Sequence, residues 1–234
     1  MTNTGATVVS GNVGVWPAAS ITGFPPGLIA AGTGFLHFGD TVAQQAQTDT
    51  TTAYLNLAGL GGAASVGPAL GGLTLVPGVY NAGAASLTGT LTLNGPGLYV
   101  FQTTSLTTAS GPGASSVSLI NGATPCDVWW QVGSSAAIGT FSQFQGNILA
   151  LTSITIATSA SLQGRALARN GTVTLDTNAV TACSGGTAPG FVVPGPVAVP
   201  PFFAAIPTLS EWAMVMLAAL LAIAGVVAMR RPAR

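Results

Sequence analysis

Side chains that carry out acid–base or metal chemistry are scarce and scattered in this sequence. Before the last 30 residues the acids are Asp40, Asp49, Asp127 and Asp176, and the one histidine is His37. No two acids share a local motif, so a carboxylate pair for glycoside hydrolysis has little support. A lone histidine without cysteine or acidic neighbours at ligand spacing does not make a zinc site. We therefore expect no enzyme activity and no metal or cofactor.

The two cysteines, Cys126 and Cys183, are the remaining reactive groups. In an exported protein an even number of cysteines suggests a disulfide, and this one would hold the end of the repetitive part of the chain. The alternative is a pair of buried thiols.

Uncharged hydroxyls and amides, rather than charged side chains, supply most of the polar groups of this sequence. Only 10 of the 234 residues are charged, or 4%, and lysine is absent, whereas about 25% is usual. A protein that binds nucleic acid needs basic residues to neutralise phosphates, so nucleic acid is excluded as a partner. Apolar residues make up 48% of the chain and recur with a period, so a packed core is expected.

Similar phrases ending in glycine recur along the chain and predict stacked coils. From Phe144 to Leu162, and from Gly146 to Gly164, the spacing is 18 residues. Alternating runs such as Ile154–Ile156 precede the glycines, and a period of two indicates strands. Three short strands in each coil of about 18 to 20 residues predict a mainly β fold, a β-solenoid.

The repeat is interrupted by one helical segment. Residues 40–60 contain no glycine or proline until their end, and Val42, Ala46, Ala53 and Leu57 fall on one stripe. We expect a single helix there, lying beside the solenoid. Repeats occur on both sides of it, so the N-terminal strands should dock among later coils, because an open apolar end is unfavourable. The solenoid would then be discontinuous.

The C-terminal part has a different composition. A proline-rich stretch at 186–207 is typical of an extended linker, and residues 208–234 hold an uncharged apolar run followed by arginines. The sequence IPTLSEW, at 206–212, resembles the IPTL-type C-terminal sorting signal of Gram-negative bacteria, although alanine follows the tryptophan where glycine is usual. This resemblance implies an exported protein at the cell surface or outside it, tethered in the membrane before processing. No signal peptide opens the chain, which predicts a misplaced or trimmed start.

Residues 2–183 resemble the microbial ice-binding (antifreeze) proteins. The phrases that carry the resemblance are TNTGATVVSGNVGVWPAASITGFPPG, LGGLTLVPGVY, LTGTLTLNGPGLYVFQ, SLINGATPCDVWWQVGSSAAIGT and NILALTSITIATSASLQGRALARNGTVTLDTN. It implies that residues 1–185 form a discontinuous right-handed β-solenoid of triangular coils with one long helix alongside. It also implies that a monomer adsorbs to ice through a flat face and inhibits ice growth or recrystallisation. Family members have another strand before the equivalent of Thr2, so the first coil is expected to be incomplete.

Some family members carry Thr-(Ala/Gly)-x-(Thr/Asn) on that face, and the sequence TGAT at 4–7 fits this pattern fully. Threonine also follows each inner strand, and a threonine ladder would present hydroxyls and methyls at the spacing of stacked coils, close to a repeat of the ice lattice. The expected ice-binding residues are Thr4, Thr7, Thr108, Thr140, Ser142, Thr158, Ser161 and Thr177.

Two alternatives remain open from the sequence. Ser153, Thr155, Thr172 and Thr174 form a second hydroxyl-bearing face, and the sequence does not choose between the two faces. Threonine and serine also simply tolerate exposed strands. A structural or adhesive surface protein that binds polysaccharide is the alternative function.

Overall fold

The structure is a computed structural model that describes residues 1–183. The predicted linker at 186–207 and the predicted membrane segment at 208–234 lie outside the described residues. Within the described part, no helix has both the length and the apolar character needed to span a membrane.

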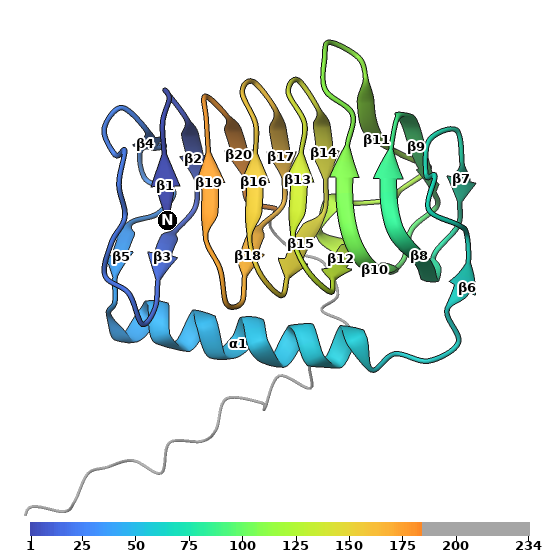
Figure 1. The fold of residues 1–234 in the computed structure, drawn as a ribbon, viewed down its shortest axis with the longest axis horizontal. Helices are drawn as coiled ribbons and strands as arrows, with labels where there is room; N and C mark the ends of the chain where they lie inside the picture. The colour runs from blue at the N-terminus through green and yellow to red at the C-terminus, as the bar shows by residue number, and fades with distance from the viewer. Residues whose placement is uncertain (184–234) are drawn as a thin grey trace, which may run out of the picture. The chain divides into compact units, whose positions relative to one another are not determined.

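The chain winds into coils with three faces (Figure 1). The front face consists of β1 (Thr2–Asn3), β19 (Val173–Leu175), β16 (Ile154–Ile156), β13 (Ala136–Ile138) and the second halves of β10 (Tyr99–Thr108) and β8 (Gly78–Leu87). The back face consists of β4 (Leu28–Ile29), β2 (Val8–Ser10), β20 (Ala179–Thr181), β17 (Ser161–Gln163), β14 (Gln143–Gln145), β11 (Ser115–Ile120), β9 (Gly89–Asn94) and β7 (Thr74–Leu75).

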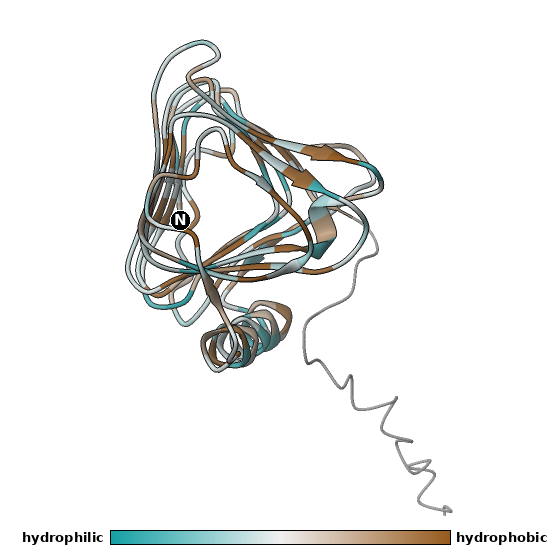
Figure 2. Cartoon of the chain, turned by 90° about the vertical axis from the view of Figure 1, so that its right-hand side faces the viewer, coloured by the Kyte–Doolittle hydropathy of each residue, from teal (hydrophilic) through white to brown (hydrophobic). Residues whose placement is uncertain are grey.

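The third face lies beside the helix, and we call it the helix face. It consists of β18 (Ala166–Ala168), β15 (Asn147–Ala150), β12 (Val128–Val132), the first halves of β10 and β8, β6 (Ala64–Ser65), and a separate pair, β3 (Val13–Val15) with β5 (Leu36–Phe38). Figure 2 looks along the stack of coils and shows the three-sided cross-section, with the helix beside one side of it. A short 3₁₀ turn, η1 (Pro125–Asp127), precedes β12.

All the strand pairs between described residues are parallel, and the predicted 18-residue register is present. Ile148 pairs with Ala166, and Phe144 pairs with Leu162. The N-terminal strands dock on the last coil, because β1 pairs with β19 and β2 pairs with β20. The predicted discontinuous β-solenoid is therefore confirmed.

Inward side chains of successive coils fill the solenoid. Tyr80, Phe101 and Trp130 stack from coil to coil, with centroid separations of 5.5 Å for Tyr80–Phe101 and 4.1 Å for Phe101–Trp130. The Phe144 ring continues this aromatic row and is tilted by 46° against Trp130, with centroids 5.0 Å apart. The Trp130 indole N–H donates to the Gln145 carbonyl at 3.0 Å, so the buried indole keeps a hydrogen bond. Stacking of this kind holds neighbouring coils in one register.

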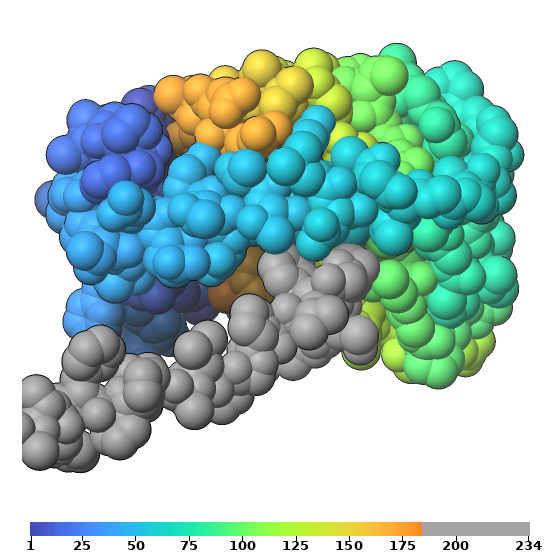
Figure 3. All heavy atoms as spheres, turned by 90° about the horizontal axis from the view of Figure 1, so that it is seen from below, coloured from blue at the N-terminus to red at the C-terminus, as the bar shows by residue number. Residues whose placement is uncertain are grey.

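The one α-helix of residues 1–183, α1 (Thr41–Ala58), lies along the helix face (Figure 3). The Asp40 carboxylate caps it by accepting from the Ala43 N–H at 2.8 Å, and this bond holds the pKa of Asp40 below its ordinary value. At the other end, Gln102 donates to the carbonyls of Leu57 and Leu60 at 2.8 and 2.9 Å. Both bonds supply donors at the end of the helix, where carbonyls have no regular intrahelical partner.

The predicted helical stripe is partly wrong. Ala53 and Leu57 are buried as expected, but Val42 and Ala46 are exposed. The buried side chains are Ala43, Thr50, Ala53, Tyr54 and Leu57. The helix is rotated from the predicted orientation because Tyr54 packs with Trp129 and Leu149.

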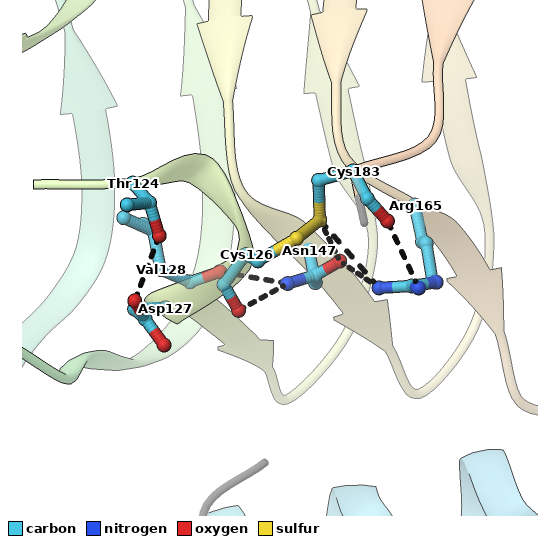
Figure 4. The surroundings of a disulfide bond; sticks show 7 residues. All are labelled: Thr124, Cys126, Asp127, Val128, Asn147, Arg165 and Cys183. Carbon is cyan, nitrogen blue, oxygen red and sulfur yellow. Dashed lines mark hydrogen bonds between the residues drawn. A yellow bond between two sulfur atoms is a disulfide. The ribbon is translucent and has the colours of Figure 1, made fainter. Parts of the chain in front are cut away.

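A disulfide joins Cys126 of η1 to Cys183, with their Cα atoms 5.5 Å apart (Figure 4). Arg165 lies beside it and donates to the Asn147 side-chain oxygen at 3.1 Å and to the Cys183 carbonyl at 3.2 Å. Asn147 in turn donates to the carbonyls of Cys126 and Val128. The end of the described chain is thus attached to two earlier coils.

We predict that Phe144→Ala lowers the free energy of unfolding by about 3–5 kcal/mol, because it leaves a cavity in the aromatic stack. Chemical denaturation of the purified protein measures this. Gln143→Ala, on the same strand but facing solvent, is the control and should change it by less than about 0.5 kcal/mol. Equal effects of the two substitutions would contradict the assigned orientation of the strand.

Candidate binding surface

The predicted site residues do not form one surface. Thr140 and Thr158 lie in equivalent corner loops between the front and back faces. Their hydroxyls are engaged within the protein: Thr140 accepts from the Gly111 N–H at 3.1 Å, and Thr158 donates to the Asp176 carboxylate at 2.5 Å. Thr4 is exposed in the same corner, and its hydroxyl lies 3.4 Å from the Leu175 carbonyl.

Thr177 does not continue the row of Thr140 and Thr158. Four residues, 157–160, separate the paired positions Ile156 and Ser161, whereas three, 176–178, separate Leu175 and Ala179. The last corner is therefore one residue shorter. Thr177 is exposed and adopts a left-handed conformation with φ 52°, and its hydroxyl donates to Asp176 at 3.0 Å.

Three predicted contact residues are buried, which removes them from any surface site. The relative exposure is 0% for Thr7, 1% for Ser142 and 9% for Thr108. Their hydroxyls turn inward and bond to one another or to neighbouring polar groups. Ser142 bonds to Thr108 at 2.7 Å, and Thr7 donates to Asn3 at 2.6 Å. These buried hydroxyls supply hydrogen-bond partners to polar groups inside the corner loops. They are therefore not available for contacts at the protein surface.

Ser161 lies on the back face rather than with Thr158. It pairs with Gln143 on one side and with Ala179 on the other. The same outward row continues through Val8 to Leu28, which is 59% exposed. This row mixes small hydroxyls, one long amide, Gln143, and apolar side chains, so the back face is uneven in both shape and chemistry.

The front face presents a regular row of small side chains. The strand register aligns one outward residue from each coil, and two isolated bridges extend the row at its ends. In order, the row is Thr22, Thr2, Thr174, Thr155, Ala137, Thr107, Ser86 and Ala69. We call it the front row. With eight coils about 4.8 Å apart, it extends about 34 Å.

The front row is exposed, and three of its six hydroxyls, those of Thr22, Ser86 and Thr107, donate to backbone carbonyls at 3.5, 3.4 and 3.4 Å. All its members are exposed except Thr174, which is half-buried. Among the described residues, no hydrogen bond occupies the hydroxyls of Thr2, Thr155 or Thr174. The neighbours in each strand, such as Ile154 and Ile156, are buried and anchor the row from below. Because threonine is stiff at χ1, methyls and hydroxyls are held in a repeating order.

A second row of hydroxyls runs along one edge of the front face. Ser135, Ser153 and Thr172 each lie one residue before a front-face strand. Ser135 and Thr152 share a hydrogen bond of 2.6 Å, and the Thr172 N–H donates to the Ser153 hydroxyl at 3.2 Å. This edge row is internally bonded and widens the polar surface.

Charged groups flank the front row: the exposed ammonium of Met1 lies one residue before Thr2, and Asp176 sits in the corner at the opposite edge of the front face. Hydrogen bonds from Thr158, and then from Thr177, lower the pKa of the Asp176 carboxyl from its ordinary value. Within residues 1–183, no three His, Cys, Asp or Glu side chains are grouped as a metal site would require. The front row itself contains only threonine, serine and alanine, so it presents an uncharged and regularly spaced array.

Sequence reasoning found part of the front row and missed the rest. Thr155 and Thr174 were identified as members of a rival face. Thr2, Thr22, Thr107 and Ser86 were missed. The last two follow the same alternation within their strands, which was a usable signal, whereas the first two join the row only through docking of the N-terminal coil.

Comparison with protein families matches two parts of the chain. A family described as "Ice-binding-like" matches residues 1–181. The IPTL-CTERM motif matches residues 204–231.

Individual relatives agree with the first match. An ice-binding protein of Nostoc sp. (strain HG1) is 50% identical over 205 residues, covering 84% of this chain and 74% of that protein. Ice-binding protein 1 of Shewanella frigidimarina is 34% identical over 213 residues, covering 77% of this chain but only 24% of that longer protein. The crystal structure of an ice-binding protein from the Antarctic ascomycete Antarctomyces psychrotrophicus superimposes with a TM-score of 0.73 at 42% identity, covering 79% of this chain and 91% of that one.

Proposed function

This chain belongs to the ice-binding-like family, and we propose that it adsorbs to ice through the front face and so inhibits ice growth or recrystallisation. The observation that carries this choice of face is the front row, which aligns threonine, serine and alanine across eight coils. Its repeat of about 4.7–4.9 Å is set by strand spacing and is close to a repeat of the ice lattice.

The chemistry of the front row supports the same conclusion. Hydroxyls can bond to water in the lattice, and methyls between them favour an ordered layer. A charged group would orient water around itself, and the front row has none. The row is also pre-ordered by backbone pairing and by β-branching, so little side-chain entropy is lost on adsorption. A single chain supplies the whole row, so we propose that the monomer is active.

The proposed location is the cell surface, by way of the sorting motif at residues 204–231. The described chain ends at Cys183, after β20 and beside Arg165, which precedes β18. This corner joins the back and helix faces and is the one opposite the front face.

We predict that Thr155→Tyr abolishes most of the thermal hysteresis, because a bulky ring in the middle of the front row prevents close contact with a lattice. Thermal hysteresis and recrystallisation inhibition of the purified protein measure this. Thr155 is exposed, so stability should change by less than about 0.5 kcal/mol.

Two matched substitutions serve as controls for this test. Gln163→Tyr, on the back face, and Thr158→Tyr, in the corner, should retain most of the activity. If Thr158→Tyr loses activity while Thr155→Tyr keeps it, the ice-binding surface is the corner ladder. If Gln163→Tyr alone loses it, the surface is the back face.

Removal of residues 188–234 should leave a soluble domain with undiminished thermal hysteresis per mole, because the front row lies wholly within residues 1–183. The shortened and full-length proteins are compared at equal molar concentration. A several-fold loss on truncation would show that the tail contributes to ice binding.

Thermal hysteresis should not vary between about pH 5 and pH 7. The lowered pKa of Asp176 keeps this carboxylate ionised throughout that range. Its stabilising bonds are fully present above the unfolded pKa of about 3.9 and are lost only as the pH falls through the lower folded value. A steep change of activity across this window, with the fold intact by circular dichroism, would be inconsistent with an uncharged binding face.

A further inference from the structure

The front row crosses one break in the order of the chain, where Thr2 of β1 pairs with Thr174 of β19. We call this boundary the seam. Coils on either side of it follow one another along the chain, so the length of each turn limits their register. At the seam no such turn joins the paired strands, and the front ladder has only two residue pairs, Thr2 with Thr174 and Asn3 with Leu175. Other contacts are therefore needed to fix the register of the row there.

The residues that anchor the front row from below change in type at the seam. Their inward column runs through Ile138, Ile156 and Leu175 and continues to Asn3. Asn3 is 4% exposed, so a buried amide takes the place of an apolar anchor. A buried amide is stable only where its donors and its acceptor have partners. The hydrogen bonds of Asn3 therefore constrain where β1 lies.

The Asn3 side chain uses both its nitrogen and its oxygen. The amide nitrogen donates to the carbonyls of Gly5 at 2.6 Å and Gly23 at 2.8 Å. The amide oxygen accepts from the Thr7 hydroxyl at 2.6 Å. Gly23 belongs to the next coil and directly follows Thr22 of the front row. One side chain thus ties the corner of the N-terminal coil to the coil beyond it.

The Thr7 hydroxyl carries this network across the seam. It is buried and accepts from the backbone N–H of Asn178 at 3.1 Å. The buried side chain of Asn178 then donates to the carbonyls of Ala157 at 2.8 Å and Ala160 at 3.1 Å, in the preceding corner. Hydrogen bonds therefore connect four successive corners, and Thr7 is their side-chain link across the seam.

This network favours one register over its neighbours. A slip of one residue at the seam would turn Asn3 outward and Thr2 into the core. It would also separate the Thr7 hydroxyl from the Asn178 N–H inside a buried corner, which is unfavourable. In coiled coils a single buried asparagine selects the alignment of two helices in the same way.

We propose that Thr7 is a positioning residue whose hydroxyl fixes the register of the N-terminal coil on the last coil, so that Thr2 and Thr22 continue the front row. Thr7 itself is buried and does not touch ice. The consequence for ice binding rests on the function proposed above, whereas the effect on register does not.

The substitution Thr7→Val in the full-length chain, in detergent, tests the register, because valine keeps the shape and lacks the hydroxyl. The amides of Thr4 and Val8 bond across the seam to the carbonyls of Leu175 and Asn178 at 3.0 and 2.8 Å. Their hydrogen exchange, measured by NMR, should become about tenfold faster or more, because the seam opens locally. Thr7→Ser keeps the hydroxyl and should restore slow exchange; failure to restore it would contradict the role of the hydroxyl.

Thr108→Val is the matched control for this measurement. Thr108 is also a buried corner hydroxyl, bonded to Ser142 at 2.7 Å, but it lies between coils that are continuous in the chain. It should leave the exchange of Thr4 and Val8 unchanged. The proposal is overturned if Thr7→Val does not accelerate exchange at the seam, or if Thr108→Val accelerates it equally. It is also overturned if Thr7→Val accelerates Ile154, away from the seam, as much as Thr4 and Val8.

Thermal hysteresis of the same variants connects the register to ice binding. Thr7→Val should lower it about twofold or more, because Thr2 and Thr22 lose their alignment with the rest of the row. Thr7→Ser and Thr108→Val should retain most of it. Full activity in Thr7→Val with an opened seam, in a protein that Thr155→Tyr inactivates, would overturn the positioning role in ice binding. If Thr155→Tyr also keeps full activity, the choice of the front face has failed, and hydrogen exchange alone decides what fixes the register.

Discussion

The parallel backbone ladder between coils is the constraint on which the binding surface depends. It sets the spacing of the front row at about 4.7–4.9 Å without any contact between the exposed side chains. Inward residues such as Ile154 and Ile156 hold each strand down, so Thr155 between them must point outward. The pairing of β1 with β19 carries the same spacing across the break between the two parts of the chain. A periodic surface is thus a consequence of backbone hydrogen bonding and core packing.

Much of the fold could be predicted because its signals are local and periodic. The 18-residue spacing from Phe144 to Leu162 corresponds to a strand pairing, and the segment at 40–60, which has no glycine or proline until its end, contains α1. Docking of the N-terminal strands was predicted from the need to cover an apolar end. The composition of the front row was harder to predict. Thr2 and Thr174 are paired because the N-terminal coil stacks on the last coil, and this pairing has no repeat spacing in the sequence.

The corner loops show why some threonines that look equivalent in sequence are exposed while others are buried. Thr140 and Thr158 follow inner strands and remain at the surface, whereas Thr108 in the same pattern is buried against Ser142. Thr177 is displaced by a corner that is one residue shorter. Whether a corner hydroxyl turns in or out depends on how many residues close the loop and on which backbone groups need partners. Those are properties of the assembled coil, so strand periodicity alone does not predict them.

The most direct test of ice adsorption through the front face is magnetisation transfer from ice protons to threonine methyls in a partly frozen, methyl-labelled sample. The account predicts transfer to Thr22, Thr2, Thr174, Thr155 and Thr107. It predicts none to Thr90 and Thr92, which point outward on the back face. Transfer to the back-face methyls without transfer to the front row would contradict it.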